Sequence, residues 1–248
     1  MPYNNFIYKI DFASPISSQS FKDSSQPFTT VPAEGTSTFI FRLSNPNADG
    51  VNNTNRVENE VAALFLCRQT LSMTLEKYSD IVPGVYDWKP YTPNTDSSTS
   101  DESDFGWIMM QFRPGVPLDS QFDKLLFSEK KTLVAEIAAI FAVIQGMSLP
   151  AGVGAYGSLT VKDGDIVSGQ PTIATGGPWE QYRDWWAGML SMALSQAERS
   201  PVLKGWRENG IRDRVDRLID TGIQTLLAPV DTSKRALIHG DFSKYLSR

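Results

Sequence analysis

The period of the hydrophobic pattern changes part-way along this chain, and this change limits the folds that it can adopt. Residues 6–12 and 38–46 alternate apolar and polar side chains, and residues 106–112 form an apolar run of strand length. Beyond residue 113 the apolar residues recur at helical spacing instead. Strands, with one helix among them, therefore precede a mainly helical half. This order predicts an α+β fold with a sheet lobe, a hinge near residues 111–116 and a helical lobe.

The first half holds one predicted helix among its strands. Apolar residues at helical spacing predict a helix over residues 55–78, and Asn52–Asn55 offer N-caps for it. Residues 82–88 predict a turn that leads into a strand, and a short strand is expected at 28–31 within a loop rich in Ser, Pro and Thr. Residues 89–104 are polar and acidic without periodicity, so we expect a solvated loop rather than a metal site.

The second half is predicted to be mainly helical. Two prolines and a glycine indicate a connector over residues 113–119. Amphipathic patterns then predict helices over residues 128–144, 178–199 and 210–227. We therefore expect residues 1–112 to form the sheet lobe with its helix, and residues 113–248 to form the helical lobe.

Composition excludes several classes of partner and chemistry. The 248 residues carry a net charge of -5, so a polyanion such as nucleic acid would be repelled overall. The only cysteine, Cys67, excludes an internal disulfide, and with only one histidine, His239, the chain lacks the ligands of an ordinary zinc site. The sequence has neither an apolar run of about 18 residues nor a signal-peptide pattern, so we expect a cytoplasmic protein without a membrane partner.

One glycine motif suggests a nucleotide site but has the wrong context. Gly152, Gly154 and Gly157 match the pattern G-x-G-x-x-G. A dinucleotide site needs a strand before this motif and a helix that begins within it. Here a predicted helix ends before the motif and a strand-like segment follows it, so we expect a plain connector.

Two charges in the first half form a candidate phosphate site. Arg42 lies on the strand predicted at 38–46, and Glu60 lies on the following helix. A strand cation that is held by a helix carboxylate could bind a phosphate group. The alternative is that both are ordinary solvated charges.

The end of the chain carries the strongest candidate. An apolar strand-like run at 236–238 leads into His239, Gly240 and Asp241. A carboxylate that directly follows a buried strand is well placed to act as a general base or a metal ligand, and His239 could hold the loop. The alternatives are a simple turn and, with fewer ligands than such sites need, a metal-dependent hydrolase that uses Asp241 and His239.

Taken in order, these segments resemble the aminoglycoside phosphotransferase and choline-kinase-like family, most closely its fungal branch. The resemblance covers almost the whole chain. The segments that carry it are FIFRL, NRVENEVAAL, GWIMMQFRPGVPLD, a tryptophan-rich helix and ALIHGD. It implies a protein-kinase-like fold of two lobes, ATP and Mg²⁺ as cofactors, and phosphorylation of a hydroxyl group on a small molecule that the sequence does not identify.

The resemblance also implies roles for particular residues. Arg42 would contact the phosphates in place of the family's usual lysine, and Glu60 would orient it. Residues 110–112, which are Met110, Gln111 and Phe112, would join the lobes and receive adenine through their backbone groups. Asp241 would be the catalytic base that takes the proton of the substrate hydroxyl, and His239 would support its loop.

Two departures from the family pattern lower the expected activity. Leu246 stands where the family has a magnesium-binding asparagine, and leucine offers no oxygen ligand. The chain ends at Arg248, so we expect it to be truncated before a second metal-binding aspartate, with a short N-terminal lobe as well. The predicted activity is therefore impaired. Alternatives are a non-catalytic kinase-like binding module, a fragment of a longer active kinase, and association with a protein partner or itself through an incomplete helical lobe.

Overall fold

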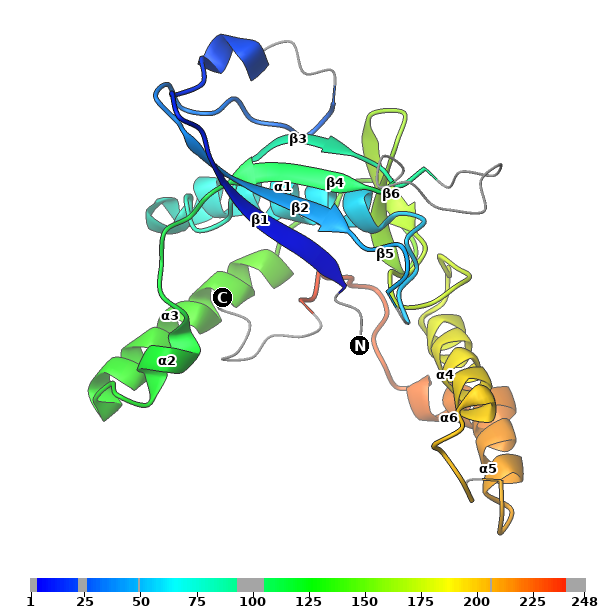
Figure 1. The fold of residues 1–248 in the computed structure, drawn as a ribbon. Coiled ribbons are helices and arrows are strands. Elements are labelled where there is room, and N and C mark those ends of the chain that lie inside the picture. Colours follow the sequence, from blue (N-terminus) through cyan, green and yellow to red (C-terminus); the bar gives the residue numbers. More distant parts are fainter. Residues whose placement is uncertain (1–3, 22–25, 49, 93–104, 206, 240–248) are drawn as a thin grey trace.

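The strands of the first half form one antiparallel sheet in the computed structural model of this protein, which describes residues 4–21, 26–48, 50–92, 105–205 and 207–239 (Figure 1). The sheet order is β1-β2-β4-β3. Its strands are β1 (Asn5–Asp11), β2 (Thr38–Ser44), β3 (Val85–Lys89) and β4 (Trp107–Gln111). A 3-10 turn, η1 (Ser18–Phe21), lies between β1 and β2, and no strand is assigned at the expected position 28–31.

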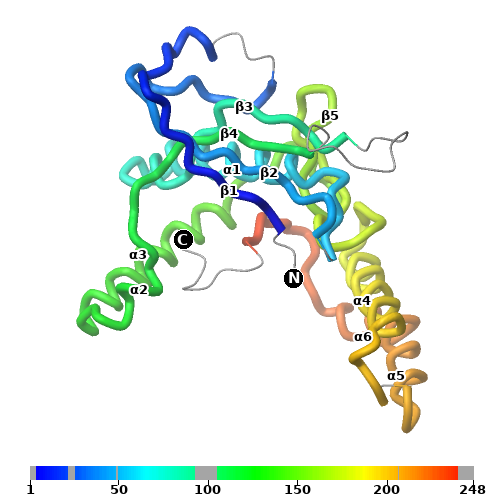
Figure 2. The backbone as a smooth tube through the Cα atoms, viewed as in Figure 1, coloured from blue at the N-terminus to red at the C-terminus, as the bar shows by residue number. Residues whose placement is uncertain are grey.

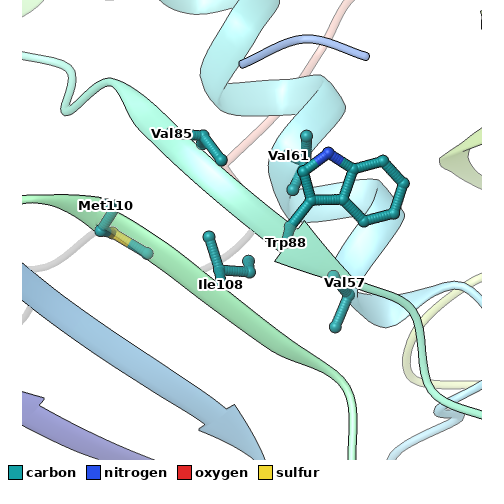
Figure 3. Packing of buried hydrophobic residues seen from close by; sticks show 6 residues of the cluster. All are labelled: Val57, Val61, Val85, Trp88, Ile108 and Met110. Carbon is teal, nitrogen blue, oxygen red and sulfur yellow. The ribbon is translucent and has the colours of Figure 1, made fainter. Parts of the chain in front are cut away.

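Helix α1 (Arg56–Thr74) packs against one face of this sheet, and a 3-10 turn, η2 (Glu76–Tyr78), follows it. Side chains from α1, β3 and β4 form a buried cluster between helix and sheet (Figure 3). A bulge between Val85 and Asp87 lets Val85 and Trp88 both reach this cluster. Its members are Val57, Val61, Val85, Trp88, Ile108 and Met110.

The other side of α1 is covered by a second cluster. A hairpin of β5 (Ser158–Lys162) and β6 (Asp165–Gly169) supplies Leu159 and Ile166, which pack against Ala62 and Leu66 of α1. Asn55 donates through Nδ2 to the carbonyl of Leu159 at 2.9 Å, so its side chain ties α1 to β5 and makes no helix-capping hydrogen bond, contrary to our expectation. Helix α1 therefore lies between two β structures.

The helices of the second half extend away from this body in two directions (Figures 1 and 2). Short α2 (Leu118–Phe122) and long α3 (Phe127–Gln145) form one arm. The other arm pairs α4 (Tyr182–Arg199) with a helix made of α5 (Ile211–Arg217), the π-helical turn η4 (Leu218–Gly222) and α6 (Ile223–Leu227). The fold is thus mixed α and β around an antiparallel sheet.

The glycine motif is a connector, as predicted. Residues 152–157 link α3 to β5, and no helix begins within them. A Cβ atom at Gly157 would lie 2.3 Å from the carbonyl oxygen of Gly169, so glycine is needed there for the close approach of β5 and β6. Helix α4 starts later than predicted because Trp179 first forms an antiparallel bridge with Tyr156.

Candidate functional site

The structure brings Arg42 of β2 and Glu60 of α1 together as an ion pair. Arg42 and its strand neighbours Ile40 and Ile108 lie on the sheet face that α1 covers. The Nη1 of Arg42 donates to Oε1 of Glu60, and the two side chains are 24% and 21% exposed. The Nε of Arg42 is a buried donor without a hydrogen-bond partner within the described ranges. This guanidinium group therefore has an unused donor, and part of its side chain remains exposed.

The guanidinium group of Arg56 adds a second positive charge near Glu60. Burial raises the pKa of Glu60, whereas the charges of Arg42 and Arg56 act to lower it. Burial, followed by repulsion from Arg42, lowers the pKa of Arg56 to about 10, although Glu60 acts against this shift. Two cations around one carboxylate leave a positive charge, which suits an anionic ligand. Arg56 was not predicted from the sequence, although its position four residues before Glu60 places both on one helix face.

Arg56 also fixes the sheet to α1. Its side chain is buried, with 8% of the residue exposed, and its Nη2 donates to the carbonyl of Asn4 at 2.6 Å and to Oδ1 of Asn5 at 2.9 Å. Its Nη1 donates to Oδ1 of Asn53 at 3.2 Å. The start of β1 is therefore held beside the ion pair.

An open strip of the sheet lies beside Arg42. Helix α1 covers β3 and β4, but Ile7 of β1, which is paired with Arg42, remains 65% exposed. Lys9 follows on the same face, and its Nζ lies 5.0 Å from the centre of the Phe112 ring. The strip thus runs from Arg42 past Ile7 and Lys9 to the segment that leaves β4.

Of the three residues expected to receive adenine, two belong to strand β4 and one lies beyond it. Met110 is 8% exposed and is part of the helix–sheet cluster. Gln111 ends β4, and both its backbone N–H and its Oε1 are hydrogen-bonded to Gly84, at 2.8 and 3.2 Å. Phe112 is the first residue beyond the strand and is half-buried beside Lys9. Only Phe112 of the three thus lies in the connecting segment.

The predicted strand at 236–238 is wrong. The structure assigns no strand to residues 231–239, because no strand among the described residues lies beside this segment to pair with it, and Ile238 is 67% exposed. Leu237, however, packs against the second cluster, which contains Ala62 of α1. Figure 2 follows the chain from α6 back to the sheet body at this point. His239 is exposed, and Asp241 and Leu246 lie outside the described residues.

Glu58 lies near the pair in sequence but plays a different part. Its Oε2 is buried without a hydrogen-bond partner in the part of the chain that the structure describes. Burial raises the pKa of this carboxyl group. Burial of the unpaired carboxyl group of Glu58 therefore lowers the stability of the fold. The ion pair between Arg42 and Glu60 largely offsets the corresponding cost for its two charges.

Two hollows in the surface lie away from this pair. One of about 490 Å³ lies between η2 and α3, with Tyr78 and Lys131 in its lining, and one of about 240 Å³ lies beside Glu198 and Arg207. Across the described ranges, no three His, Cys, Asp or Glu residues gather into a group that could hold a metal ion. None of the helices in those ranges is both long enough and apolar enough to cross a membrane.

Comparisons of this chain with protein-family models, with curated proteins and with solved structures found no match. Its function is therefore argued from residues and geometry. Within the described residues, the feature with the clearest chemistry is the Arg42–Glu60 pair beside the open strip.

Proposed function

We propose that this protein binds ATP in the manner of the aminoglycoside phosphotransferase family and belongs to its kinase-like two-lobe fold. The observation that carries the proposal is the ion pair between Arg42 on an inner strand and Glu60 on the helix against it. In protein kinases a strand lysine and a helix glutamate form such a pair, and the cation contacts the phosphates. Arginine keeps the charge and adds a planar fork that can hold two phosphate oxygens.

The mixed polar and apolar character of the open strip supports a nucleotide ligand. Phosphates would lie at the guanidinium group of Arg42, whose side chain is 24% exposed. The base would lie toward Phe112, whose ring is already accompanied by the cation of Lys9. Between them, Ile7 offers an exposed apolar side chain on the same face. Charge at one end and apolar surface at the other match a nucleotide.

Phosphoryl transfer would need Asp241. In the proposed reaction its carboxylate takes the proton of a substrate hydroxyl while the oxygen of that hydroxyl bonds to the γ-phosphorus and the bond to ADP breaks. Packing of Leu237 against the cluster that contains Ala62 carries the chain toward α1 shortly before this residue. Magnesium, when bound, would neutralise charge on the phosphates. Because Leu246 cannot bind a metal, we propose that transfer by this chain is weak.

Titration calorimetry of the 248-residue chain with ATP, with and without Mg²⁺, tests the binding proposal. The double variant Arg42→Gln/Glu60→Gln keeps a hydrogen-bonding pair but removes both charges. It should bind ATP at least about 10-fold more weakly, since charge-assisted hydrogen bonds are worth about 1.5–3 kcal/mol. Arg42→Lys should retain binding. Arg214→Gln, an exposed arginine in α5, is the matched control and should bind like the unaltered chain.

Absence of ATP binding by the unaltered chain, at millimolar ATP and with the fold confirmed by circular dichroism, contradicts the proposal. Equal binding by the double variant contradicts the assigned site. A non-catalytic kinase-like module is the second candidate, favoured by Leu246. ATP turnover that disappears in Asp241→Ala would exclude it, whereas Mg²⁺-dependent binding without turnover would support it.

A further inference from the structure

The outer edge of β1 has free backbone hydrogen-bonding groups. Among the strands that the structure describes, β1 is the end strand of the sheet and pairs with β2 alone (Figure 1). Phe12 donates to the carbonyl of Ser37, and Asn45 donates to that of Asn4, so the even-numbered residues of β1 bond to β2. The odd-numbered residues, Ile7 and Lys9 among them, therefore direct their backbone N–H and C=O groups away from the sheet. Within the described ranges, nothing bonds to the backbone of Ile7 or Lys9 on that edge.

This edge lacks most of the features that keep sheet edges apart. Proteins protect edge strands with proline, bulges, several charges or a covering segment. β1 has the sequence NFIYKID, with no proline, and its pairing with β2 is regular over seven residues. Ile7 is 65% exposed and Tyr8 is 52% exposed, one on each face of the sheet. Lys9 is the only cation on the strand.

We infer that the outer edge of β1 pairs with β1 of a second copy of this chain, antiparallel and centred on Tyr8. A two-fold axis through Tyr8 matches all of β1 with all of its partner, so that Asn5 opposes Asp11 and Ile7 opposes Lys9 of the other copy. These odd-numbered residues are the ones whose backbone groups point outward, so the hydrogen-bond pattern fits the register. Phe6 opposes Ile10 on the face away from α1, and the two sheets become one.

The neighbouring registers are poorer. An axis at Lys9 would place two lysines opposite each other, which is destabilising. An axis at Ile7 would pair only residues 5–9 within the strand, because β1 begins at Asn5. The register at Tyr8 places no like charges opposite each other and uses the full strand. The pairing uses the outward backbone groups of β1, whereas the proposed nucleotide strip uses the side chains of Ile7 and Lys9. The tests below measure association and not nucleotide binding, so either proposal can fail without the other.

Cross-linking tests the register directly. In this arrangement the two Tyr8 residues form a non-hydrogen-bonded pair, whose Cβ atoms are about 4.5–5.5 Å apart, close enough for a strained cross-strand disulfide. In a Cys67→Ser background, Tyr8→Cys should give a covalent dimer under mild oxidation. Phe6→Cys and Ile10→Cys are the matched controls: each alone should stay uncoupled, whereas a mixture of the two should couple.

A second variant separates pairing from folding. Ile7→Pro removes an N–H that points outward and is not used by β2, so the monomer should keep its fold by circular dichroism. The unaltered chain should sediment as a concentration-dependent dimer, and Ile7→Pro as a monomer. A monomeric unaltered chain at 100 μM, roughly 100-fold above a typical micromolar dissociation constant, overturns the inference. A dimer that survives Ile7→Pro, or coupling of Ile10→Cys alone as fast as that of Tyr8→Cys, overturns it too.

Discussion

The sheet body and the helical arms both carry apolar side chains in regular patterns but bury them to very different extents. In the body, Phe39, Val61 and Leu71 are fully buried. Helices α3, α4 and α5 have no buried residue, and α6 has only Ile223. Phe127 at the start of α3 is 84% exposed, and Leu226 of α6 is 66% exposed.

The difference shows that a helix gains stability mainly from the elements that pack against it, and only weakly from the hydrophobic pattern of its own sequence. α1 has the sheet on one side and the β5–β6 hairpin on the other, so its apolar residues are buried on both. The apolar faces of α3 and α4 meet fewer partners. Burial of apolar surface stabilises the folded state by about 25 cal/mol per Å², so the arms gain little stability in this way. Association through the helical half stays a prediction.

Truncating one phenylalanine in each region tests this contrast most strongly. Phe39→Ala should lower the free energy of unfolding by about 3–5 kcal/mol, because its buried ring packs against Phe12, Phe21 and Tyr86. Phe127→Ala should change it by no more than about 0.5 kcal/mol, because that ring is exposed. Urea unfolding followed by tryptophan fluorescence measures both. Equal losses in the two variants would show that α3 is buried in solution.

Removing one arginine from each region should give the next largest difference. Arg56→Ala should cost about 2–3 kcal/mol, because three hydrogen bonds shorter than 3.3 Å, which tie α1 to β1 and to the turn at Asn53, are lost. Arg214→Ala, on exposed α5, should leave the unfolding midpoint in urea unchanged. An Arg56→Ala variant as stable as the unaltered chain would mean that these contacts do not hold the start of β1.

Local patterns predicted elements in both regions, and the helices expected at 128–144 and 210–227 form over residues 127–145 and 211–227. The strands expected at 38–46 and 106–112 appear as Thr38–Ser44 and Trp107–Gln111, because alternation and burial agree there. The expected helix 55–78 forms as α1 and η2. The β6 strand was missed, although Asp163-Gly164 is the signature of a tight hairpin turn and both residues have positive φ.

Features that depend on distant partners could not be predicted. Residues 236–238 have the composition of a strand, but a strand needs a neighbour, and none lies beside this segment among the described residues. The side chain of Asn55 bonds to Leu159, more than one hundred residues away, instead of capping its own helix. The pairing of Arg42 with Glu60 was raised from their positions on a strand and the following helix, which left ordinary solvated charges as an alternative, and the family resemblance implied the pair as well.

Measuring the free energy of unfolding as a function of pH distinguishes a buried carboxyl group in the body from an exposed one on an arm. Burial raises the pKa of Glu58 in the folded state, so the folded protein binds its proton more tightly than the unfolded chain does. Stability should therefore fall as pH rises from about 4, the unfolded value, through the raised pKa. Glu58→Gln should remove this loss and be more stable at pH 7 by about 1 kcal/mol.

Glu136 on α3 supplies the opposite sign as a control. A hydrogen bond from Lys77 lowers the pKa of Glu136, so its contribution to stability is present above its unfolded pKa and is lost as pH falls through the lowered value. Glu136→Gln should remove this pH dependence by losing the small stabilisation at neutral pH, and it should match the unaltered chain at acid pH, where Glu136 is protonated. If Glu58→Gln lowers stability at pH 7, its carboxylate has a partner in solution, and the assignment of a buried charge is wrong.

The smallest effect is expected for an ion-pair network on the second arm. Arg212 of α5 pairs with Glu198 of α4 and, through Nε at 2.8 Å, with Asp216, but its side chain is 37% exposed. Exposed pairs contribute little and are screened by salt, so Arg212→Gln should leave the thermal midpoint of the protein unchanged at high salt. A salt-dependent shift as large as that of Arg56→Ala would contradict this. It would show that α4 and α5 unfold together with the sheet. The body and the arms would then differ in how much apolar surface they bury, but not in the cooperativity of their unfolding.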